Sequence, residues 1–424
     1  MHTGLIMALG LLSTGACAQD DPFGRMPKWT VEQLHEDFDA LVRALKDHHP
    51  ALYRYCTPQA LDRTVDSLRT SLDRPATEFE LLGRITALYP LLGDGHTIFL
   101  PTEEWAGTAP ARYFPLPVVW SDTALYIGCG GARTDHPHCG ARIQAINGVP
   151  ASAIMGTLLT RQIRDGVHTS YANWILNRWF RSYYRFSFGE PERFHVLLDQ
   201  NGERVQVMLE ALVAAELPIQ PSPEPERALE LSFPDDSIAL LRIGSFQRDR
   251  LKPREVDAAF VTIREHGIRR LVLDLRGNQG GEPRNAKRLL AHLLNRRFNL
   301  VVKGPSAGIT RPVRNPFSGS LCTLMDGGSF SATAMVLAQL EASALGPLIG
   351  EESGGNRTVI SGSARTYHLP NTRIACTISR KDWWLQEGEA DGRGVMPTYA
   401  IANDDEDDTT LLEAIRIIRL PSRP

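Results

Sequence analysis

The sequence predicts an α/β protein in which a helical N-terminal domain and a small β-rich domain precede an α/β domain. Apolar residues recur at helical spacing from residue 30 to residue 92, and short β-branched and aromatic runs alternate with turn residues from 113 to 212. Strand and helix patterns then alternate in the C-terminal half. A chain of 424 residues is long enough for two or three such domains. The expected divisions are a leader at 1–18, a helical domain at 19–105, a β-rich domain at 106–216, a linker at 217–236 and the α/β domain at 237–424.

The first residues have the pattern of a signal peptide. The apolar run at 4–15 is too short to span a bilayer and is followed by small residues. The sequence ACA at 16–18 fits cleavage before Gln19, whereas a lipobox at the same place would put a lipid anchor on Cys17. Simple cleavage is favoured because Thr14 stands where a lipobox usually has leucine. We therefore expect an exported protein, periplasmic or extracellular, without a membrane span in its mature body.

Helix and strand signals order the first two domains. VEQLHEDFDALVRALKDHH and FELLGRITALYPLL are amphipathic helix patterns, and Pro50 and Pro75 break the segments. The runs FPLPVVW, ALYIG, RIQAINGVP, RFHVLL and RVQVMLE predict strands. Residues 141–159 combine a strand, an Asn-Gly turn and a helical pattern, an order that resembles the second half of a PDZ-type module. The proline-rich segment at 217–236 is the expected linker.

The C-terminal half alternates strands and helices. IALLRIGSF, RRLVLDLRGN and SLCTLMDGG predict strands, and DAAFVTIREHG, NAKRLLAHLLNRR and SATAMVLAQLEAS predict helices. This order implies a parallel-rich sheet with helices packed against it. The acidic run at 404–408 is interpreted as a solvated loop before a final helix, LLEAIRIIR.

Charge and cysteine usage exclude several function classes. The 46 Lys and Arg residues face 49 Asp and Glu residues, and the net charge of −3 leaves no cationic excess for binding nucleic acid. None of the six cysteines forms a CxxC pair, and their spacings match no zinc site, so no metal is expected. Cys129 and Cys139 bracket a short polar loop that a disulfide would close in an oxidising compartment, although the sequence leaves this pairing open.

Three short stretches place polar residues and glycines where an apolar run ends: GDGHT at 93–97, LDLRGNQGG at 273–281 and DGGSFSATAMVLAQL at 326–340. Sites in α/β sheets are built at such positions. In the third stretch Ser331 falls where a helix begins, so the helix dipole and free N–H groups would favour an alkoxide nucleophile. A plain N-cap role explains the same position. Ser329, inside the turn, is the rival serine.

The other two stretches offer further parts of a serine hydrolase. Adjacent glycines after LVLDL let backbone N–H groups approach a ligand closely, as an oxyanion hole requires, although a tight turn needs glycine equally. In the same stretch Asp274 and Arg276 are expected to form a structural ion pair. His96 can take a proton from serine near neutral pH. Asp94 beside it is either an orienting acid or a turn former.

Together these stretches resemble a known family. GDGHT, LVLDLRGNQGG, GGSFSATA, GEESGGNRTVISG at 350–362 and DGRGVMP at 391–397 occur in the order found in tail-specific, or C-terminal processing, serine peptidases and the related tricorn core. Several motifs in the correct order are more specific than any one alone. The resemblance implies a crotonase-like or ClpP-like α/β catalytic domain, a small β-rich or PDZ-like domain, and hydrolysis of peptide bonds without a cofactor.

The resemblance also assigns roles to individual residues. It makes Ser331 the nucleophile, and it builds the oxyanion hole from Gly280 or Gly281 together with the N–H of Ala332. Members with a Ser–Lys dyad carry G-K-G where this chain has Gly355-Asn356-Arg357, so their lysine base is missing here.

The tricorn-like branch uses a histidine from the motif that His96 matches, which makes His96 the expected general base. The serine that precedes this histidine in the tricorn core is Gly95 here. The acid that orients the histidine aligns with Asp391, which is one methylene shorter than the usual glutamate, and Glu389 lies close by as an alternative.

The expected function is that of an exported serine peptidase whose partners are peptide or protein substrates. Two rival interpretations remain open. One is a catalytically inactive peptide-binding protein, which the departures at Gly95 and Asp391 favour. The other is an exported esterase that uses the same serine through an acyl-enzyme.

Overall fold

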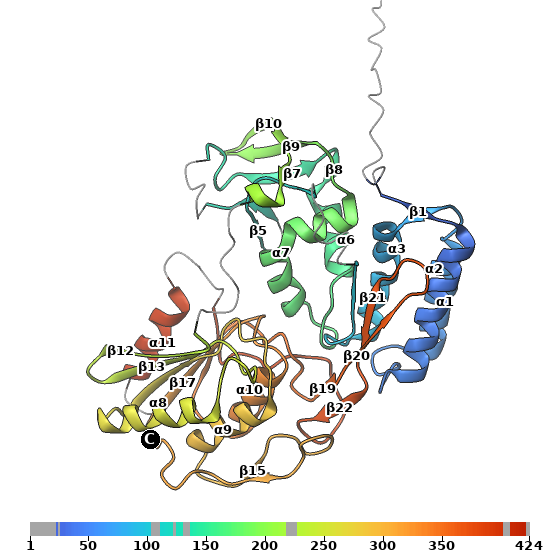
Figure 1. Cartoon of the computed structure of the whole chain (residues 1–424). Coiled ribbons are helices and arrows are strands. Elements are labelled where there is room, and N and C mark those ends of the chain that lie inside the picture. Colours follow the sequence, from blue (N-terminus) through green and yellow to red (C-terminus); the bar gives the residue numbers. More distant parts are fainter. Residues whose placement is uncertain are drawn as a thin grey trace, which may run out of the picture.

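The computed structural model describes residues 23, 26–102, 111–121, 124–129, 136–217, 227–401 and 408–420. Figure 1 shows a helical N-terminal part, a middle part built on one sheet, and a C-terminal part in which helices cover a second sheet. The leader predicted at 1–18, with its alternative processing at Cys17, lies outside the described residues. Of the helices in the described ranges, none is both long enough and apolar enough to cross a bilayer.

The N-terminal part is helical, as its spacing of apolar residues predicts. Its helices are α1 (Val31–His48), α2 (Pro58–Thr70), α3 (Glu78–Ile85) and α4 (Tyr89–Leu92). Thr30, Thr57 and Thr77 begin the first three helices, and each side chain accepts a hydrogen bond from a backbone N–H of the first turn. Gly93 adopts a left-handed conformation with φ of 55°, which ends α4 and turns the chain toward the GDGHT motif.

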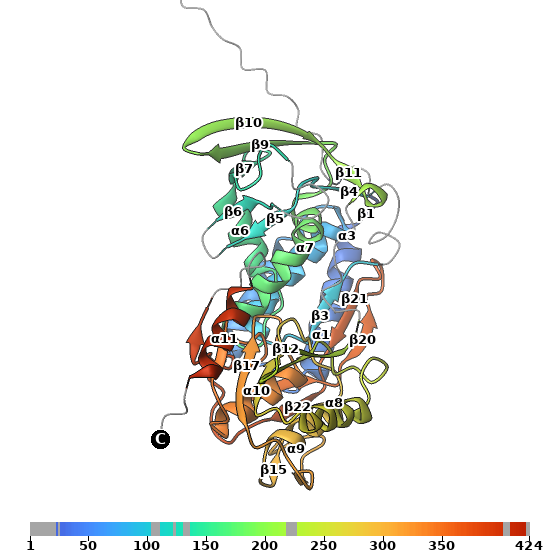
Figure 2. The same cartoon turned by 90° about the vertical axis from the view of Figure 1, so that its left-hand side faces the viewer.

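The middle part is a six-stranded sheet with the strand order β10-β9-β7-β6-β5, to which β8 adds at β7. The strands are β5 (Val118–Trp120), β6 (Leu125–Ile127), β7 (Arg142–Ile146), β8 (Val149–Pro150), β9 (Arg193–Gln200) and β10 (Glu203–Glu210). The predicted Asn-Gly turn is confirmed, because Asn147 and Gly148 have φ of 49° and 77° between β7 and β8. Figure 2 shows β9 and β10 as a long hairpin at the end of the molecule opposite β15.

Two helices pack on this sheet, and only the first is predicted by the sequence. They are α6 (Ala151–Thr160) and α7 (Ser170–Phe188). Leu176, Phe180 and Tyr184 of α7 join the apolar core between helix and sheet. The aromatic residues of α7 are typical of strands, so their composition hides the helical spacing.

The C-terminal part confirms the predicted parallel-rich sheet. Its strand order is β12-β13-β14-β17-β18-β23, and only the β12–β13 pair is antiparallel. The strands are β12 (Leu229–Asp235), β13 (Ile238–Ile243), β14 (Arg270–Asp274), β17 (Ser320–Met325), β18 (Leu348–Gly350) and β23 (Tyr399–Ala400). The helices are α8 (Pro253–Glu265), α9 (Pro283–Leu293), α10 (Ala332–Ala342) and α11 (Thr409–Arg419). Figures 1 and 2 show α11 on one face of this sheet and the other three helices on the opposite face.

Strand β12 corrects the linker prediction. Residues 229–235, assigned to the linker because of the preceding prolines, pair with β13 as an edge strand of the C-terminal sheet. Edge strands tolerate proline because one of their sides has no ladder to interrupt, and Pro234 lies at the register shift between Ser232 and Asp235. Residues 218–226 lie outside the described residues.

A small sheet joins the two ends of the chain. Strand β3 (Ile98–Leu100), just after the GDGHT motif, pairs with β21 (Ala375–Ile378), which also pairs with β20 (Arg365–His368). This pairing holds the end of the helical part against the C-terminal part. The motifs at residues 93–97 and 326–340 therefore meet although they are distant in sequence.

The remaining elements are short. They are β1 (Lys28–Trp29), β2 (Ala76–Thr77), β4 (Arg112–Tyr113), β11 (Leu212–Val213), β15 (Phe298–Asn299), β16 (Ile309–Thr310), β19 (Val359–Gly362) and β22 (Lys381–Trp384), with 3-10 turns at Thr86–Leu88 and Ala214–Glu216. Cys129 and Cys139 form a disulfide, so the pairing that the sequence left open is present.

Candidate active site

Ser331 lies in a sharp turn between strand β17 and helix α10. Its φ and ψ angles are 53° and −122°, a conformation that residues with a side chain rarely adopt and that stores about 1–3 kcal/mol. Its side chain caps no N–H of the helix, which excludes the plain N-cap role. The hydroxyl is partly exposed at the helix N-terminus, where backbone N–H groups and the helix dipole favour negative charge.

The rival Ser329 is fixed inside the turn. Its Oγ donates to the carbonyl oxygen of Leu275 at 2.9 Å and accepts from the N–H of Asp326 at 3.1 Å. The Asp326 carboxylate in turn accepts the N–H groups of Gly277 and Gly328. Ser329 is fully buried, so it supports the strained turn and is not available to a substrate.

His96 contacts the Ser331 hydroxyl directly. The distance from His96 Nε2 to Ser331 Oγ is 3.0 Å, which is within hydrogen-bonding range for a nucleophile and its base. The imidazole also stacks on the Phe330 ring, with 4.8 Å between the ring centroids. Burial lowers the pKa of His96, and the charge of Asp94 raises it in part. A neutral imidazole, which can accept the serine proton, is therefore favoured at neutral pH.

Gly95 is required by the position of Phe330. A Cβ atom on residue 95 would lie 2.5 Å from Phe330 Cζ and 2.7 Å from Cε2, far inside van der Waals contact. Phe330 is itself held by Tyr171, whose ring stacks on it at 4.1 Å. The serine of the tricorn core therefore has no room at this position, which explains the departure noted in the sequence.

Asp94 is the acid that the structure places beside His96. One carboxylate oxygen, Oδ1, accepts the backbone N–H of His96 at 2.9 Å. The other, Oδ2, accepts from Thr97 Oγ1 at 2.6 Å and from His49 Nε2 at 3.1 Å. His49 Nδ1 accepts the N–H of Ala51, so the proton of a neutral His49 is on Nε2 and points at Asp94. His49 is the residue that directly follows helix α1.

Asp94 is ionised despite its burial. Burial on its own would raise the pKa of this carboxyl, but the hydrogen bond and charge of His49, the charge of His96 and the Thr97 hydroxyl together hold it well below its usual range. A permanent negative charge therefore lies next to the base. Asp94 therefore fills the turn-forming role, and it contacts His96 through the backbone N–H and not through the imidazole.

The structure does not bring Asp391 or Glu389 to His96, which corrects the predicted acid. The Asp391 carboxylate pairs with Arg357 at 2.5 Å and accepts the N–H of Arg393 at 3.0 Å on the exposed surface. Glu389 is also exposed. Within the described residues, His96 Nδ1 is buried without a hydrogen-bond partner. Asp391 pairs instead with Arg357, which follows the position of the missing lysine.

Of the two candidate glycines of the oxyanion hole, Gly280 lies next to Ser331. A Cβ atom on Gly280 would lie 2.7 Å from both Ala332 N and Ser331 Cβ, so only glycine fits there. Its N–H donates to Asn278 Oδ1 at 2.9 Å. Gly281, with φ of 136°, packs instead against the backbone of Phe246. Ala332 is the first residue of α10, where the N–H has no intrahelical acceptor.

The ion pair between Asp274 and Arg276 is confirmed and is structural. Arg276 Nη2 lies 2.8 Å from Asp274 Oδ2, and Arg276 Nη1 lies 2.6 Å from Asp408 Oδ1. The pair ties β14 to the start of α11. It makes no contact with Ser331 among the hydrogen bonds of the described residues.

Sequence reasoning missed a buried acid beside this site. Asp165, in the loop between α6 and α7, packs against Gly95 and accepts the N–H of Asn356 at 3.0 Å. Burial and the nearby charge of Asp94 raise the pKa of Asp165 to about 8, so the carboxyl is largely protonated at neutral pH. Asn356 also donates to the Tyr55 hydroxyl at 2.9 Å. Asp165 belongs to no motif, and only the close packing against Gly95 reveals it.

Comparisons with known proteins give one family match and several structures of similar fold. Residues 237–401 match Peptidase family S41. Among solved structures, mature CPAF aligns over 92% of this chain and 97% of its own, with a TM-score of 0.66 at 12% sequence identity. Mature CPAF complexed with lactacystin has a TM-score of 0.65 and aligns over 92% of this chain and 98% of its own. A CPAF mutant has a TM-score of 0.68 and aligns over 92% of this chain and 96% of its own. Both are 12% identical in sequence to this chain. Curated protein sequences give no significant match.

The fold and the site define the chain as a serine-type peptidase, a hydrolase whose substrates are peptides or proteins. The part of the chain that carries Ser331 is the part that matches family S41. The likeness to CPAF, at its low identity, concerns the mixed α/β fold alone.

Proposed function

We propose that the chain is an exported peptidase that hydrolyses peptide bonds through an acyl-enzyme on Ser331, with His96 as general base. The observation that carries the proposal is the 3.0 Å contact between His96 Nε2 and Ser331 Oγ. It joins a strained serine at a helix N-terminus to a partly buried imidazole whose pKa is lowered by burial. This combination is what a serine nucleophile requires.

The reaction follows from this geometry. His96 Nε2 accepts the hydroxyl proton as Ser331 Oγ forms a bond to the peptide carbonyl carbon. The N–H of Ala332, joined by that of Gly280 once it leaves Asn278 Oδ1, stabilises the negative oxygen of the tetrahedral intermediate. His96 then returns the proton to the amine as the C–N bond breaks. Water, deprotonated by the same imidazole, hydrolyses the acyl-enzyme.

Asp94 acts as the positioning acid in this proposal. Its carboxylate fixes the backbone of His96 and supplies a negative charge that stabilises the imidazolium formed during attack. Asn356, which occupies the place of the dyad lysine, cannot act as a base. The missing lysine and the contact between His96 and Ser331 favour the histidine-containing, tricorn-like branch. The PDZ-like form of residues 106–216 is proposed on the strand, Asn-Gly turn and helix at 141–159 and on the family resemblance, and the crotonase-like form of the catalytic domain on the family resemblance.

Export is proposed from two features of the chain. The residues 1–18 have a signal-peptide pattern, and a disulfide such as Cys129–Cys139 persists in oxidising compartments. Intact mass and N-terminal sequencing of the protein recovered from the cell fractions and the medium of its host test this. A mature chain beginning at Gln19 supports soluble export, a lipidated Cys17 supports a membrane anchor, and an unprocessed cytoplasmic chain contradicts both.

Two observations favour a second candidate, a peptide-binding protein without turnover. His96 Nδ1 has no hydrogen-bond partner among the described residues, and the Gly280 N–H is occupied by Asn278. A site with a poorly oriented base and a half-closed oxyanion hole can bind peptides and yet cleave slowly.

A fluorophosphonate probe separates the two candidates, because it labels only an activated serine. The wild type and the variants Ser331→Ala and His96→Ala are labelled, and the modified peptide is mapped by mass spectrometry. Ser67→Ala and His195→Ala, which change exposed residues of α2 and β9, are the matched controls. Labelling at Ser331 that depends on His96 supports the peptidase. An unlabelled wild type with a cooperative unfolding transition supports the binding protein.

A further inference from the structure

His49 joins the end of helix α1 to the turn that carries His96. Its Nε2 lies 3.1 Å from Asp94 Oδ2, and both side chains are only 1% exposed. The backbone N–H of His49 donates to the carbonyl oxygen of Leu45, so the residue is fixed as the cap of α1. The reaction described for Ser331 uses Asp94 but gives no role to this buried histidine.

The hydrogen bonds of the His49 imidazole determine which nitrogen carries the proton. Nδ1 accepts the backbone N–H of Ala51 at 3.2 Å, and a ring nitrogen that accepts has no proton of its own. A neutral His49 therefore donates from Nε2 to Asp94. Because both nitrogens are engaged, the ring has one orientation and its donor points at the carboxylate.

Asp94 accepts three side-chain or backbone donors, and two of them belong to its own turn. They are the N–H of His96 at 2.9 Å and the Thr97 hydroxyl at 2.6 Å. Among the hydrogen bonds of the described residues, only the one from His49 reaches this carboxylate from another element. Burial raises the pKa of Asp94, and the hydrogen bond from His49 is the largest of the effects that lower it.

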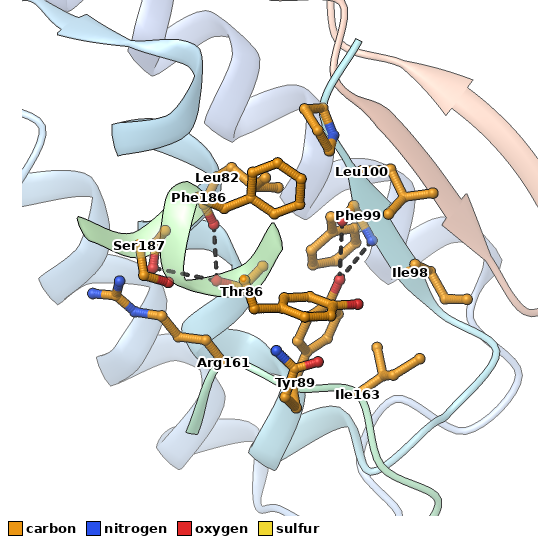
Figure 3. Close-up of a pocket in the computed structure, with 14 residues that line it drawn as sticks. Leu82, Thr86, Tyr89, Ile98, Phe99, Leu100, Arg161, Ile163, Phe186 and Ser187 are labelled. Atoms are coloured by element: carbon orange, nitrogen blue, oxygen red, sulfur yellow. Dashed lines mark hydrogen bonds between the residues drawn. The ribbon is translucent and has the colours of Figure 1, made fainter. Parts of the chain in front are cut away.

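Other bonds fix the backbone on either side of this turn. Tyr89 begins α4 before the turn and Phe99 lies in β3 after it, and the N–H of Phe99 donates to the Tyr89 hydroxyl at 2.6 Å. Figure 3 shows this bond at the wall of a small pocket, and the two rings stack with 5.0 Å between their centroids. These contacts hold the backbone of the turn, whereas the bond from His49 holds the Asp94 side chain.

Helix α1, which carries His49 at its end, is anchored independently of the turn. Asp37 of α1 is fully buried and accepts the N–H groups of Asn371 at 2.7 Å and Thr372 at 2.8 Å. The Thr372 hydroxyl also donates to it at 2.6 Å. Both partners lie between β20 and β21, so α1 is fixed to the C-terminal part of the chain. His49 therefore meets Asp94 from a rigid support.

We propose that His49 is a positioning residue for the general base, because it holds the Asp94 carboxylate that in turn holds the backbone of His96. This inference rests on the proposed function, since it concerns the base of that reaction. The buried side chain of His49 does not touch a substrate and acts only through Asp94. Without its donor, the buried carboxylate is protonated more readily, and His96 loses the charge that stabilises its imidazolium.

Two substitutions of His49 separate this role from a purely structural one. His49→Gln places an amide donor where Nε2 meets Asp94, whereas His49→Asn places an oxygen where Nδ1 meets Ala51 and is too short to reach Asp94. We expect His49→Asn to lower kcat and the rate of fluorophosphonate labelling about tenfold at unchanged KM, and His49→Gln to stay within about threefold of the wild type. A role in the Ala51 turn alone predicts the reverse order. His48→Asn, which changes the neighbouring histidine that stacks on Tyr367, is the matched control and should react as the wild type does.

The same substitution in the Asp94→Asn background shows whether His49 acts through Asp94. We expect His49→Asn to change the labelling rate there by less than about twofold, because the charge that His49 holds is already absent. The unfolding temperature of every variant is measured in parallel. If His49→Asn does not unfold cooperatively, His49→Leu, which fills the space without a polar group, takes its place in the comparison.

Three results would overturn the proposal. They are wild-type rates in a folded His49→Asn or His49→Leu, a slower His49→Gln than His49→Asn, and an undiminished effect of the substitution in the Asp94→Asn background. In each of them the wild type still reacts with the probe, so the proposed function stands. A wild type that neither reacts with the probe nor cleaves peptides contradicts the proposed function itself, and this inference with it.

Discussion

The ring of Phe330 fills the space that a side chain on Gly95 would need, and the His96 imidazole that contacts Ser331 stacks on the same ring. Phe330 stacks on His96 on one side and on Tyr171 on the other. The imidazole is thus held by ring packing and by its own backbone bond to Asp94, rather than by a hydroxyl at residue 95. The site achieves the base–nucleophile contact by a different local packing from the one its motif resemblance implies.

Restoring the serine of the tricorn core should therefore harm this protein. In Gly95→Ser the new Cβ would overlap Phe330 Cζ, so either Phe330 or His96 must move. We expect a loss of about 1–3 kcal/mol in the free energy of unfolding and a large fall in kcat. Denaturant unfolding and peptidase kinetics check this. Gly156→Ser is the matched control, because a Cβ on Gly156 meets no atom within 4 Å. Wild-type activity in Gly95→Ser would contradict the role given to Phe330.

Asp94, and not Asp391, should be the acid that catalysis depends on. Asp94→Asn removes the charge beside His96 and disturbs the bonds to His49 and Thr97, so kcat should fall by about 10²-fold or more. Asp391→Asn breaks only an exposed pair with Arg357 and should retain activity within about twofold. Steady-state kinetics of both variants decide between them. The reverse ranking would restore the acid that the motif alignment favoured.

The pH dependence of kcat/KM should report His96. Because burial lowers the pKa of His96, the acid limb should have its midpoint below the usual histidine value of about 6.5. Asp94 raises this pKa in part, so Asp94→Asn should move the midpoint of any residual activity further toward acid. A pH–rate profile of the free enzyme measures both midpoints. A midpoint above that of free histidine, or a shift toward alkaline pH in the variant, would rule out His96 as the titrating base.

Asp165 should make the folded state less stable as pH rises. Its pKa is raised to about 8 in the folded protein, above the usual aspartate value of about 3.9. Between these values the folded state binds more protons than the unfolded state, so the contribution to the free energy of unfolding falls as pH increases. Asp165→Asn removes this pH dependence, because the asparagine side chain is neutral at every pH and, like the protonated acid, has one donor group and one acceptor oxygen.

The measurement for Asp165 is the free energy of unfolding of wild type and Asp165→Asn at several pH values. We expect the difference between variant and wild type to shift in favour of the variant from about pH 4 to pH 8. Above that range it should become constant. A difference that does not change with pH would show that Asp165 titrates normally.

The sequence predicts the fold best where one local pattern determines an element. Alternating strands and helices predict the parallel β13–β14–β17 core, and Asn147-Gly148 predicts the β7–β8 turn. It fails where tertiary packing overrides the pattern. The aromatic residues of α7 are typical of strands, but Phe180 and Tyr184 belong to one apolar core that the helix shares with the sheet. Pro234 suggests a linker, but it lies in β12 at the edge of the C-terminal sheet.

In the candidate site, too, local motifs predict some residues and tertiary packing determines the others. Ser331 and His96 are predicted because each lies in a compact motif, whereas the family resemblance gave Ala332 with either Gly280 or Gly281 and left the choice of glycine open. The strained backbone of Ser331 has no sequence signal, since most residues with φ of 53° would be expected to be glycine. The predicted acid is wrong because Asp391 was assigned by its alignment with the glutamate of the family motif that DGRGVMP resembles. Its actual position depends on the pair with Arg357, which no local pattern encodes.

Cleavage of an unfolded protein substrate by purified wild type and by Ser331→Ala tests the central claim most directly. Products are identified by mass spectrometry, and the unfolding temperature of each protein is measured in parallel. We predict that the wild type releases peptides and that Ser331→Ala releases none. The variant should be at least as stable as the wild type, because alanine and serine bear the same backbone strain at this position. Equal cleavage by a folded Ser331→Ala protein would contradict the account.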